Sequence, residues 1–83
     1  MTCLSRLIPG QTIKPHRDFH DNGCRVRIHA PLVSNEHCVI RCGADKSIML
    51  PGFLYAIDPT EEHETVNNGK TDRIHLFWNM VGI

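Results

Sequence analysis

Short apolar and β-branched runs, each ended by turn-forming residues, are the feature that most constrains the fold of this chain. No window of about 11 residues shows the spacing of apolar positions that is typical of a helix. The breaks are rich in Gly, Pro, Asn and Asp, as in Pro9-Gly10, Asp21-Asn22-Gly23 and Pro51-Gly52. Strands are expected over residues 4–8, 11–15, 24–33, 38–42, 47–50, 53–57, 64–67 and 72–80. Short strands at this spacing predict an all-β sandwich or barrel.

Length and charge restrict the function classes. The 83 residues have room for one compact domain, which we expect to span residues 1–83. Lys plus Arg and Asp plus Glu number 9 each, so the chain lacks the basic surplus of a nucleic-acid-binding protein. No apolar run approaches the roughly 18 residues that a membrane span needs. The first six residues do not have the pattern of a signal peptide, and we expect a cytoplasmic location.

The four cysteines are Cys3, Cys24, Cys38 and Cys42. Without a secretion signal they are expected to stay reduced. Cys38 and Cys42 would lie on one strand, about 13 Å apart, which is too far for a disulfide. A chain of this size without disulfides often depends on a metal or a partner chain for its stability.

Two expected strands alternate polar and apolar residues. Because successive side chains of a strand point to opposite faces, the polar residues of each strand gather on one face. This face holds Arg25, Arg27 and His29 in the first strand, and Arg73 and His75 together with the aromatic Phe77 in the second. These faces could point to water, or they could line the interior of a small barrel, where arginine would meet an anion. The presence or absence of a metal site decides between the two interpretations.

Two histidines and a carboxylate suggest such a site. His16 and Asp18, two residues apart, can share a face of a strand. A mononuclear Fe(II) oxygenase binds its metal with two histidines and one carboxylate and leaves the other positions open. His63, at the start of a late strand, fits the second histidine. Asp21 is an alternative carboxylate, although its spacing from His16 suits strand geometry less well. An isolated His-x-Asp pair is usually solvated, but the order and spacing of His16, Asp18 and His63 indicate a metal site.

A keto-acid cosubstrate would also need a cation for its far carboxylate. Arg73 suits this role because the planar guanidinium can bind a carboxylate through two hydrogen bonds. Asn68-Gly69 is a strong hairpin signal. We therefore expect a hairpin that folds Arg73 back beside the strand that His63 begins.

Five segments of the chain also match the motifs of a known family. They are Pro15-His16-Arg17-Asp18, residues 25–35, residues 52–58 together with His63, Asn67-Asn68-Gly69 and Arg73-Ile74-His75-Leu76. In register from about residue 7 to residue 79, the chain resembles the aspartyl/asparaginyl β-hydroxylase family, and in particular those members that have a complete His/Asp/His set.

The resemblance implies a double-stranded β-helix, which is a cupin-like jelly roll. It implies a dioxygenase that depends on Fe(II) and 2-oxoglutarate, consumes O₂ and hydroxylates an unactivated C–H bond. In such an enzyme His16, Asp18 and His63 would bind the iron. Arg73 would hold the far carboxylate of 2-oxoglutarate, and Arg27 and His29 would lie beside this cosubstrate. His29 could hydrogen-bond one of its carboxylates.

Two other functions stay open. One is a non-catalytic cupin-like module that binds a metal or a small molecule. The other is a zinc hydrolase with the same three ligands, but a hydrolase has no need of arginines for a keto acid. The substrate could be an Asp or Asn side chain in a peptide, a free amino acid or a lipid-linked group. The sequence also leads us to expect a homodimer or a larger oligomer. Few strands precede His16, and an open sheet edge could pair with a second copy and bury Leu4, Leu7 and Ile8.

Overall fold

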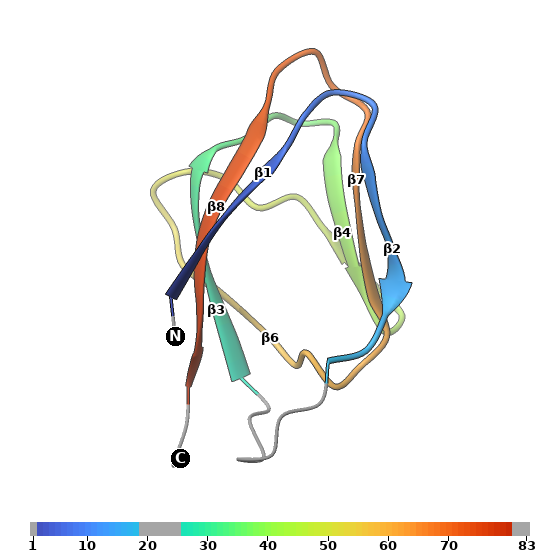
Figure 1. Ribbon diagram of the computed structural model, residues 1–83, viewed down its shortest axis with the longest axis vertical. Coiled ribbons are helices and arrows are strands. Elements are labelled where there is room, and N and C mark those ends of the chain that lie inside the picture. The colour runs from blue at the N-terminus through green and yellow to red at the C-terminus, as the bar shows by residue number, and fades with distance from the viewer. Residues whose placement is uncertain (1, 19–25, 81–83) are drawn as a thin grey trace.

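The computed structural model describes residues 2–18 and 26–80, which form eight antiparallel strands and no helix (Figure 1). The strands are β1 (Thr2–Leu7), β2 (Thr12–His16), β3 (Val26–Val33), β4 (Cys38–Cys42), β5 (Asp45–Ser47), β6 (Tyr55–Ile57), β7 (His63–Asn67) and β8 (Arg73–Met80). Each expected strand has a counterpart. The largest displacement concerns β5, which precedes most of the expected 47–50 segment. Asp21, Cys24 and Arg25 lie outside the described residues.

The strands form two four-stranded sheets, β1-β8-β3-β6 and β2-β7-β4-β5. Strands pair from the two ends of the chain inward: β1 with β8, β2 with β7, β3 with β6 and β4 with β5. The chain is thus a long antiparallel hairpin that is rolled up into a two-sheet sandwich. This order is consistent with the jelly roll that the sequence led us to expect, and the all-β fold class is confirmed.

Two Pro-Gly turns lie where the sequence places them. Gly10, between β1 and β2, has a φ of 85°, and Gly52, between β5 and β6, has a φ of 94°. Residues other than glycine rarely adopt such φ angles. Proline followed by glycine is the usual composition of a type II turn. The Gly10 N–H also donates to the Asn67 carbonyl at 2.8 Å, which ties this turn to the end of β7.

The expected hairpin at Asn68-Gly69 is wrong. Strands β7 and β8 belong to different sheets, so the segment between them crosses the sandwich. The fully buried Asn67 explains this path: its Nδ2 donates to the carbonyls of Leu7 and Thr71, each at 2.9 Å, and its Oδ1 accepts from the Gly69 N–H at 3.0 Å. As a result Arg73 pairs with Leu7 of β1 and not with the strand that His63 begins.

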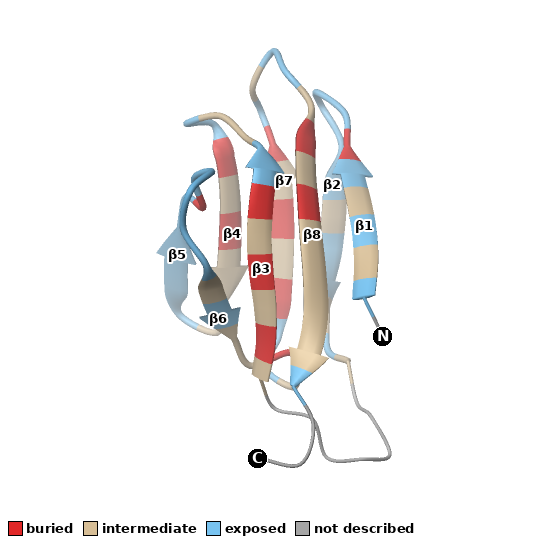
Figure 2. Cartoon of the chain, turned by 90° about the vertical axis from the view of Figure 1, so that its left-hand side faces the viewer, coloured by how far each residue is buried: buried red, intermediate tan, exposed pale blue. Residues whose placement is uncertain are grey.

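The polar faces of β3 and β8 point inward. Burial alternates over most of β3 and over the first half of β8, as the banding in Figure 2 shows, and the buried positions include Arg27, His29, Arg73 and His75. The second interpretation of these faces, the lining of an interior, is therefore confirmed. The apolar residues between them face outward and are half-buried, and the buried hydrophobic residues are few: Leu7, Cys38, Ile40 and Met49.

Cys3, Cys38 and Cys42 are free thiols, as expected. Within the described ranges, the chain forms no helix of the length and apolarity that a membrane crossing requires.

Candidate metal centre

His16 and His63 lie opposite each other on the neighbouring strands β2 and β7. They are register partners, and their ring centroids are 4.3 Å apart. Asp18 lies two residues beyond His16, just after β2, where its N–H donates to the Pro59 carbonyl at 2.9 Å. That bond holds the end of β2 against the segment before β7. The strand pairing thus brings a near pair and a distant histidine to one point.

Backbone carbonyls fix the tautomers of both histidines. The Nδ1 of His16 lies 2.7 Å from the Lys14 carbonyl, and the Nδ1 of His63 lies 2.8 Å from the Glu61 carbonyl. Since a carbonyl only accepts, each Nδ1 carries a hydrogen, so Nε2 is the nitrogen that each ring can offer to a metal. Such outer hydrogen bonds are usual for metal-binding histidines.

The three potential ligand atoms converge. The Nε2 atoms of His16 and His63 lie 3.6 and 3.5 Å from Oδ2 of Asp18, and one atom from each residue lies within 4.8 Å of the others. Two imidazoles and a carboxylate form the facial donor set of non-haem Fe(II) sites. The residues present therefore fit the metal that the resemblance implies.

Arg27 fixes the orientation of Asp18. Its NH1 donates to Oδ2 of Asp18 at 2.9 Å, its Nε donates to Oδ1 of Asn79 at 2.8 Å, and its guanidinium carbon lies 5.1 Å from the centre of the Phe77 ring. Burial acts to raise the pKa of Asp18, but the hydrogen bond and the charge of Arg27, together with the two histidines, lower it below the usual value. The carboxylate is thereby kept ionised.

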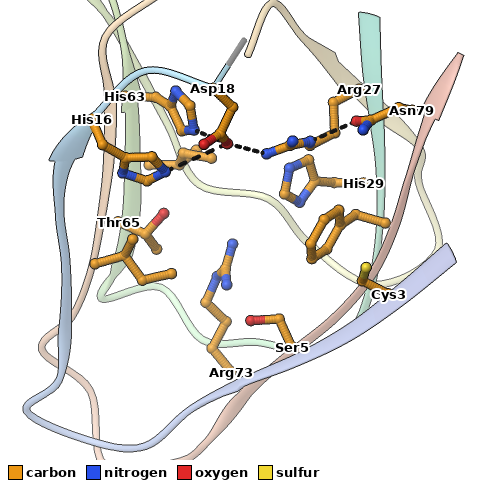
Figure 3. Close-up of a pocket in the computed structure, with 13 residues that line it drawn as sticks. Cys3, Ser5, His16, Asp18, Arg27, His29, His63, Thr65, Arg73 and Asn79 are labelled. Atoms are coloured by element: carbon orange, nitrogen blue, oxygen red, sulfur yellow. Dashed lines mark hydrogen bonds and ion pairs between the residues drawn. The ribbon is translucent and has the colours of Figure 1, made fainter. Parts of the chain in front are cut away.

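A cavity of about 330 Å³ extends from these residues into the sandwich (Figure 3). Side chains from both sheets line it. They are Cys3, Ser5, Ile13, His16, Asp18, Arg27, His29, Ile40, His63, Thr65, Arg73, Phe77 and Asn79. The candidate metal ligands and Arg73 thus reach into one space from strands of different sheets.

Arg73 is a buried cation in the wall of this cavity. Its residue is 3% exposed, and no carboxylate of residues 2–18 or 26–80 forms an ion pair with it. Its NH2 donates to Nδ1 of His75 at 3.0 Å. Burial lowers the pKa of Arg73 to about 10, so the guanidinium is still charged at neutral pH. A buried charge without a counterion favours the binding of an anion.

Two more buried histidines lie next to Arg73. The Nδ1 atoms of His29 and His75 are 3.1 Å apart, and the His29 ring stacks on Phe77 with centroids 5.5 Å apart. Burial, followed by the charge of Arg73, lowers the pKa of His29 to about 4 and that of His75 to about 3. Both rings are therefore neutral near pH 7.

The structure brings together in one cavity all six residues that the sequence singled out: His16, Asp18, His63, Arg27, His29 and Arg73. Their roles toward iron and cosubstrate stay predictions. Asn79 and Thr65 were missed. Alternation counted onward from Arg73 would have placed Asn79 on the cavity face. Ser5 of β1 reaches the cavity through the register between β1 and β8, and the sequence does not reveal that register.

Fold and side chains define a two-sheet β-protein with a candidate His/Asp/His metal centre. The chain belongs to the aspartyl/asparaginyl beta-hydroxylase family, whose model matches residues 1–82. This confirms the resemblance seen in the sequence and supports a hydroxylase-type function. A search of curated proteins finds no match.

Among solved structures, TT1209 from Thermus thermophilus has a similar fold, with a TM-score of 0.72 and 22% sequence identity. The match covers 94% of this chain and 69% of TT1209. At this identity the likeness concerns the fold alone.

Proposed function

We propose that the chain is an Fe(II)- and 2-oxoglutarate-dependent dioxygenase that hydroxylates an unactivated C–H bond. One observation carries the proposal: the buried Arg73 guanidinium, which has no carboxylate partner in the described ranges, faces the same cavity as the His16, Asp18 and His63 set. A metal site alone would suit many functions. A metal site together with an uncompensated cation suits a ligand that chelates the metal at one end and carries a carboxylate at the other, as 2-oxoglutarate does.

His16, Asp18 and His63 would hold the iron, and the bound metal would supply the O₂ chemistry that couples decarboxylation of the keto acid to hydroxylation. Arg73 would bind the far carboxylate of the cosubstrate through two parallel hydrogen bonds. Arg27 would keep Asp18 ionised and oriented through the bond between them. His29, which also lines the cavity, would lie beside the cosubstrate. The apolar side chains of Ile13 and Ile40 would limit the access of water.

The overall reaction balances without any other reductant. Substrate R–H, O₂ and 2-oxoglutarate give R–OH, succinate and CO₂, with one oxygen atom in the alcohol and the other in succinate. The two electrons that O₂ requires beyond those of the C–H bond come from the oxidative decarboxylation of the keto acid. The family supports an aspartyl or asparaginyl side chain as the group hydroxylated, and we propose that it belongs to a peptide or to a free amino acid. A cytoplasmic location accords with the free thiols of Cys3, Cys38 and Cys42.

An anaerobic titration tests the proposal. Fe(II) is added to the protein with and without 2-oxoglutarate, and the visible spectrum is recorded. We expect a weak charge-transfer band only when both are present, since chelation of Fe(II) by the keto acid produces it. The absence of this band from protein shown to contain Fe(II) would contradict the dioxygenase and favour a non-catalytic binding module.

A further inference from the structure

His75 connects the two basic side chains that line the inner part of the cavity. Its Nδ1 lies 3.0 Å from NH2 of Arg73 and 3.1 Å from Nδ1 of His29. A guanidinium nitrogen can only donate, so Nδ1 of His75 must be the acceptor and carries no hydrogen. The contact with His29 is then a hydrogen bond only if Nδ1 of His29 carries the hydrogen.

The second nitrogen of His29 follows from this. Burial and the nearby arginines keep the His29 ring neutral, so the ring has a single N–H, which is at Nδ1. Its Nε2 therefore holds a bare lone pair. This atom is buried, and no hydrogen-bond partner for it is found among residues 2–18 and 26–80. The same holds for Nε2 of His75, which carries the N–H of that ring. Buried polar atoms without a partner are uncommon in folded proteins.

We propose that His75 is a positioning residue, which holds the Arg73 guanidinium in the cavity wall and fixes His29 in the tautomer whose Nε2 is a hydrogen-bond acceptor. The geometry of the metal site alone does not reveal this role, because His75 does not line the cavity itself.

The tautomer determines which chemical group can lie against His29. A bare Nε2 cannot donate to a carboxylate, so in this tautomer His29 lies beside the cosubstrate without the hydrogen bond to a carboxylate that the resemblance led us to expect. Arg73 and His29 then have different roles: Arg73 takes the carboxylate of the cosubstrate, and His29 packs beside it as a neutral ring. The part concerning ligands depends on the proposed function, whereas the tautomer does not.

Two substitutions separate positioning from mere packing. In His75→Asn, the side-chain Oδ1 lies near the place of Nδ1 and can still accept from both Arg73 and His29. In His75→Leu, a side chain of similar volume fills the space but offers no acceptor. His37→Asn serves as the control, because His37 is exposed and belongs to the loop before β4.

Nitrogen-15 NMR of the ligand-free, metal-free protein reads the tautomers directly. We expect His29 to show a protonated Nδ1 and an unprotonated Nε2 in the wild type, in His75→Asn and in His37→Asn, and to show a mixture of tautomers in His75→Leu. A protonated Nε2 in the wild type overturns the inference, whether or not the protein binds 2-oxoglutarate.

Calorimetric binding of 2-oxoglutarate to the protein loaded with Mn(II), in place of Fe(II), supplies the second readout. His75→Leu should weaken binding by about tenfold or more, the usual effect of losing a hydrogen bond to a charged group, and His75→Asn should restore most of it. Equal weakening in both variants would show that His75 only fills space. If the wild type does not bind 2-oxoglutarate, the proposed function fails, and the NMR result alone decides the role of His75. If His75→Leu does not fold, the wild-type tautomer and His75→Asn still decide it.

Discussion

His16 and His63 are direct register partners across β2 and β7, with ring centroids 4.3 Å apart. The register between these strands shifts between Ile13 and His16, where β2 contains Pro15. Proline lacks an N–H and is tolerated because β2 is an edge strand of its sheet. The irregularity ends at His16, opposite His63, so two residues that are far apart in the sequence meet where a metal could bind.

The first prediction separates metal from cosubstrate. His63→Ala should abolish the binding of Fe(II), because a buried ligand with a fixed tautomer is removed. Arg73→Ala should keep the metal but weaken 2-oxoglutarate by about 2–5 kcal/mol, the usual cost of truncating one partner of a buried charge pair. Arg73→Lys should not restore full affinity, since a single ammonium cannot replace two parallel hydrogen bonds. Calorimetry under anaerobic conditions measures both affinities, and equal loss of metal in the alanine variants would contradict the separate roles.

The second prediction concerns the contact between Arg27 and Asp18. Arg27→Leu removes the donor that orients and ionises this carboxylate. Metal affinity should fall by about 10–100-fold, as is typical when the hydrogen-bond partner of a ligand is lost. Arg17→Leu is the matched control, because Arg17 is exposed and adjacent to Asp18 but does not line the cavity. Comparable losses in the two variants would indicate a general effect of charge and not of the contact.

Alternation and turn residues were sufficient to predict most of the fold, because both are local properties of the chain. They placed the strands, the Pro-Gly turns and the face shared by Arg73 and His75. The path after β7 could not be predicted from local signals. Asn68-Gly69 has the composition of a hairpin, yet the side chain of Asn67 bonds to the carbonyl of Leu7 in a distant strand and carries the chain to the other sheet.

The candidate site was predictable to a similar degree. The residue types and their order pointed to His16, Asp18, His63 and Arg73. The bond between Arg27 and Asp18 was not foreseen, since it depends on how the two sheets face each other. The function of His75 was also not apparent: alternation places it beside Arg73, but its contact with His29 depends on the register between β3 and β8.

The third prediction concerns pH. The folded-state pKa of His75 is lowered to about 3, below the ordinary value near 6.5 of the unfolded chain. Between these values the unfolded state binds more protons, so the free energy of unfolding falls as the pH decreases from about 6.5 toward 3. His75→Asn removes this contribution. The metal-free variant should therefore lose about 1–2 kcal/mol less than the wild type between pH 7 and pH 5.

Urea unfolding at a series of pH values measures this difference. His37→Asn is the control, because His37 is already exposed in the folded protein. Parallel pH profiles for the wild type and His75→Asn would contradict a neutral, buried His75.

The fourth prediction concerns Asn67, which is fully buried. Asn67→Ala removes the bonds to Leu7, Thr71 and Gly69 and leaves buried backbone groups unpaired. The free energy of unfolding should decrease by about 2–4 kcal/mol. Asn68→Ala, at the exposed neighbouring position, should change it by less than about 0.5 kcal/mol. Denaturant titration of both variants gives the two values, and similar results would show that the crossing segment does not depend on Asn67.

The last prediction concerns assembly. We propose that two copies of the chain pair through β1. Among the described strands it is an edge of its sheet and pairs with β8 alone, which leaves one row of its N–H and C=O groups open to a second copy. Leu4 and Ile8, which are 68% and 42% exposed, would be buried by pairing.

The expectation that Leu7 would be buried in the same way is wrong, because Leu7 already packs inside the chain. On the outer face Leu4 lies opposite Leu76, which lies opposite Ala30, so the apolar surface continues away from the edge.

Sedimentation velocity at micromolar concentration measures the assembly, for a chain of 9.4 kDa. We expect a dimer for the wild type and a monomer for Leu4→Glu, because a charge on the pairing strand would be desolvated in the interface. Leu50→Glu is the matched control: it introduces the same charge at an exposed leucine between β5 and β6, away from the β1 edge, and should stay dimeric. A wild-type monomer that added metal does not change would rule out the dimer. A dimer that withstands Leu4→Glu would show that the copies associate through another surface, since the desolvated glutamate could not be accommodated at β1.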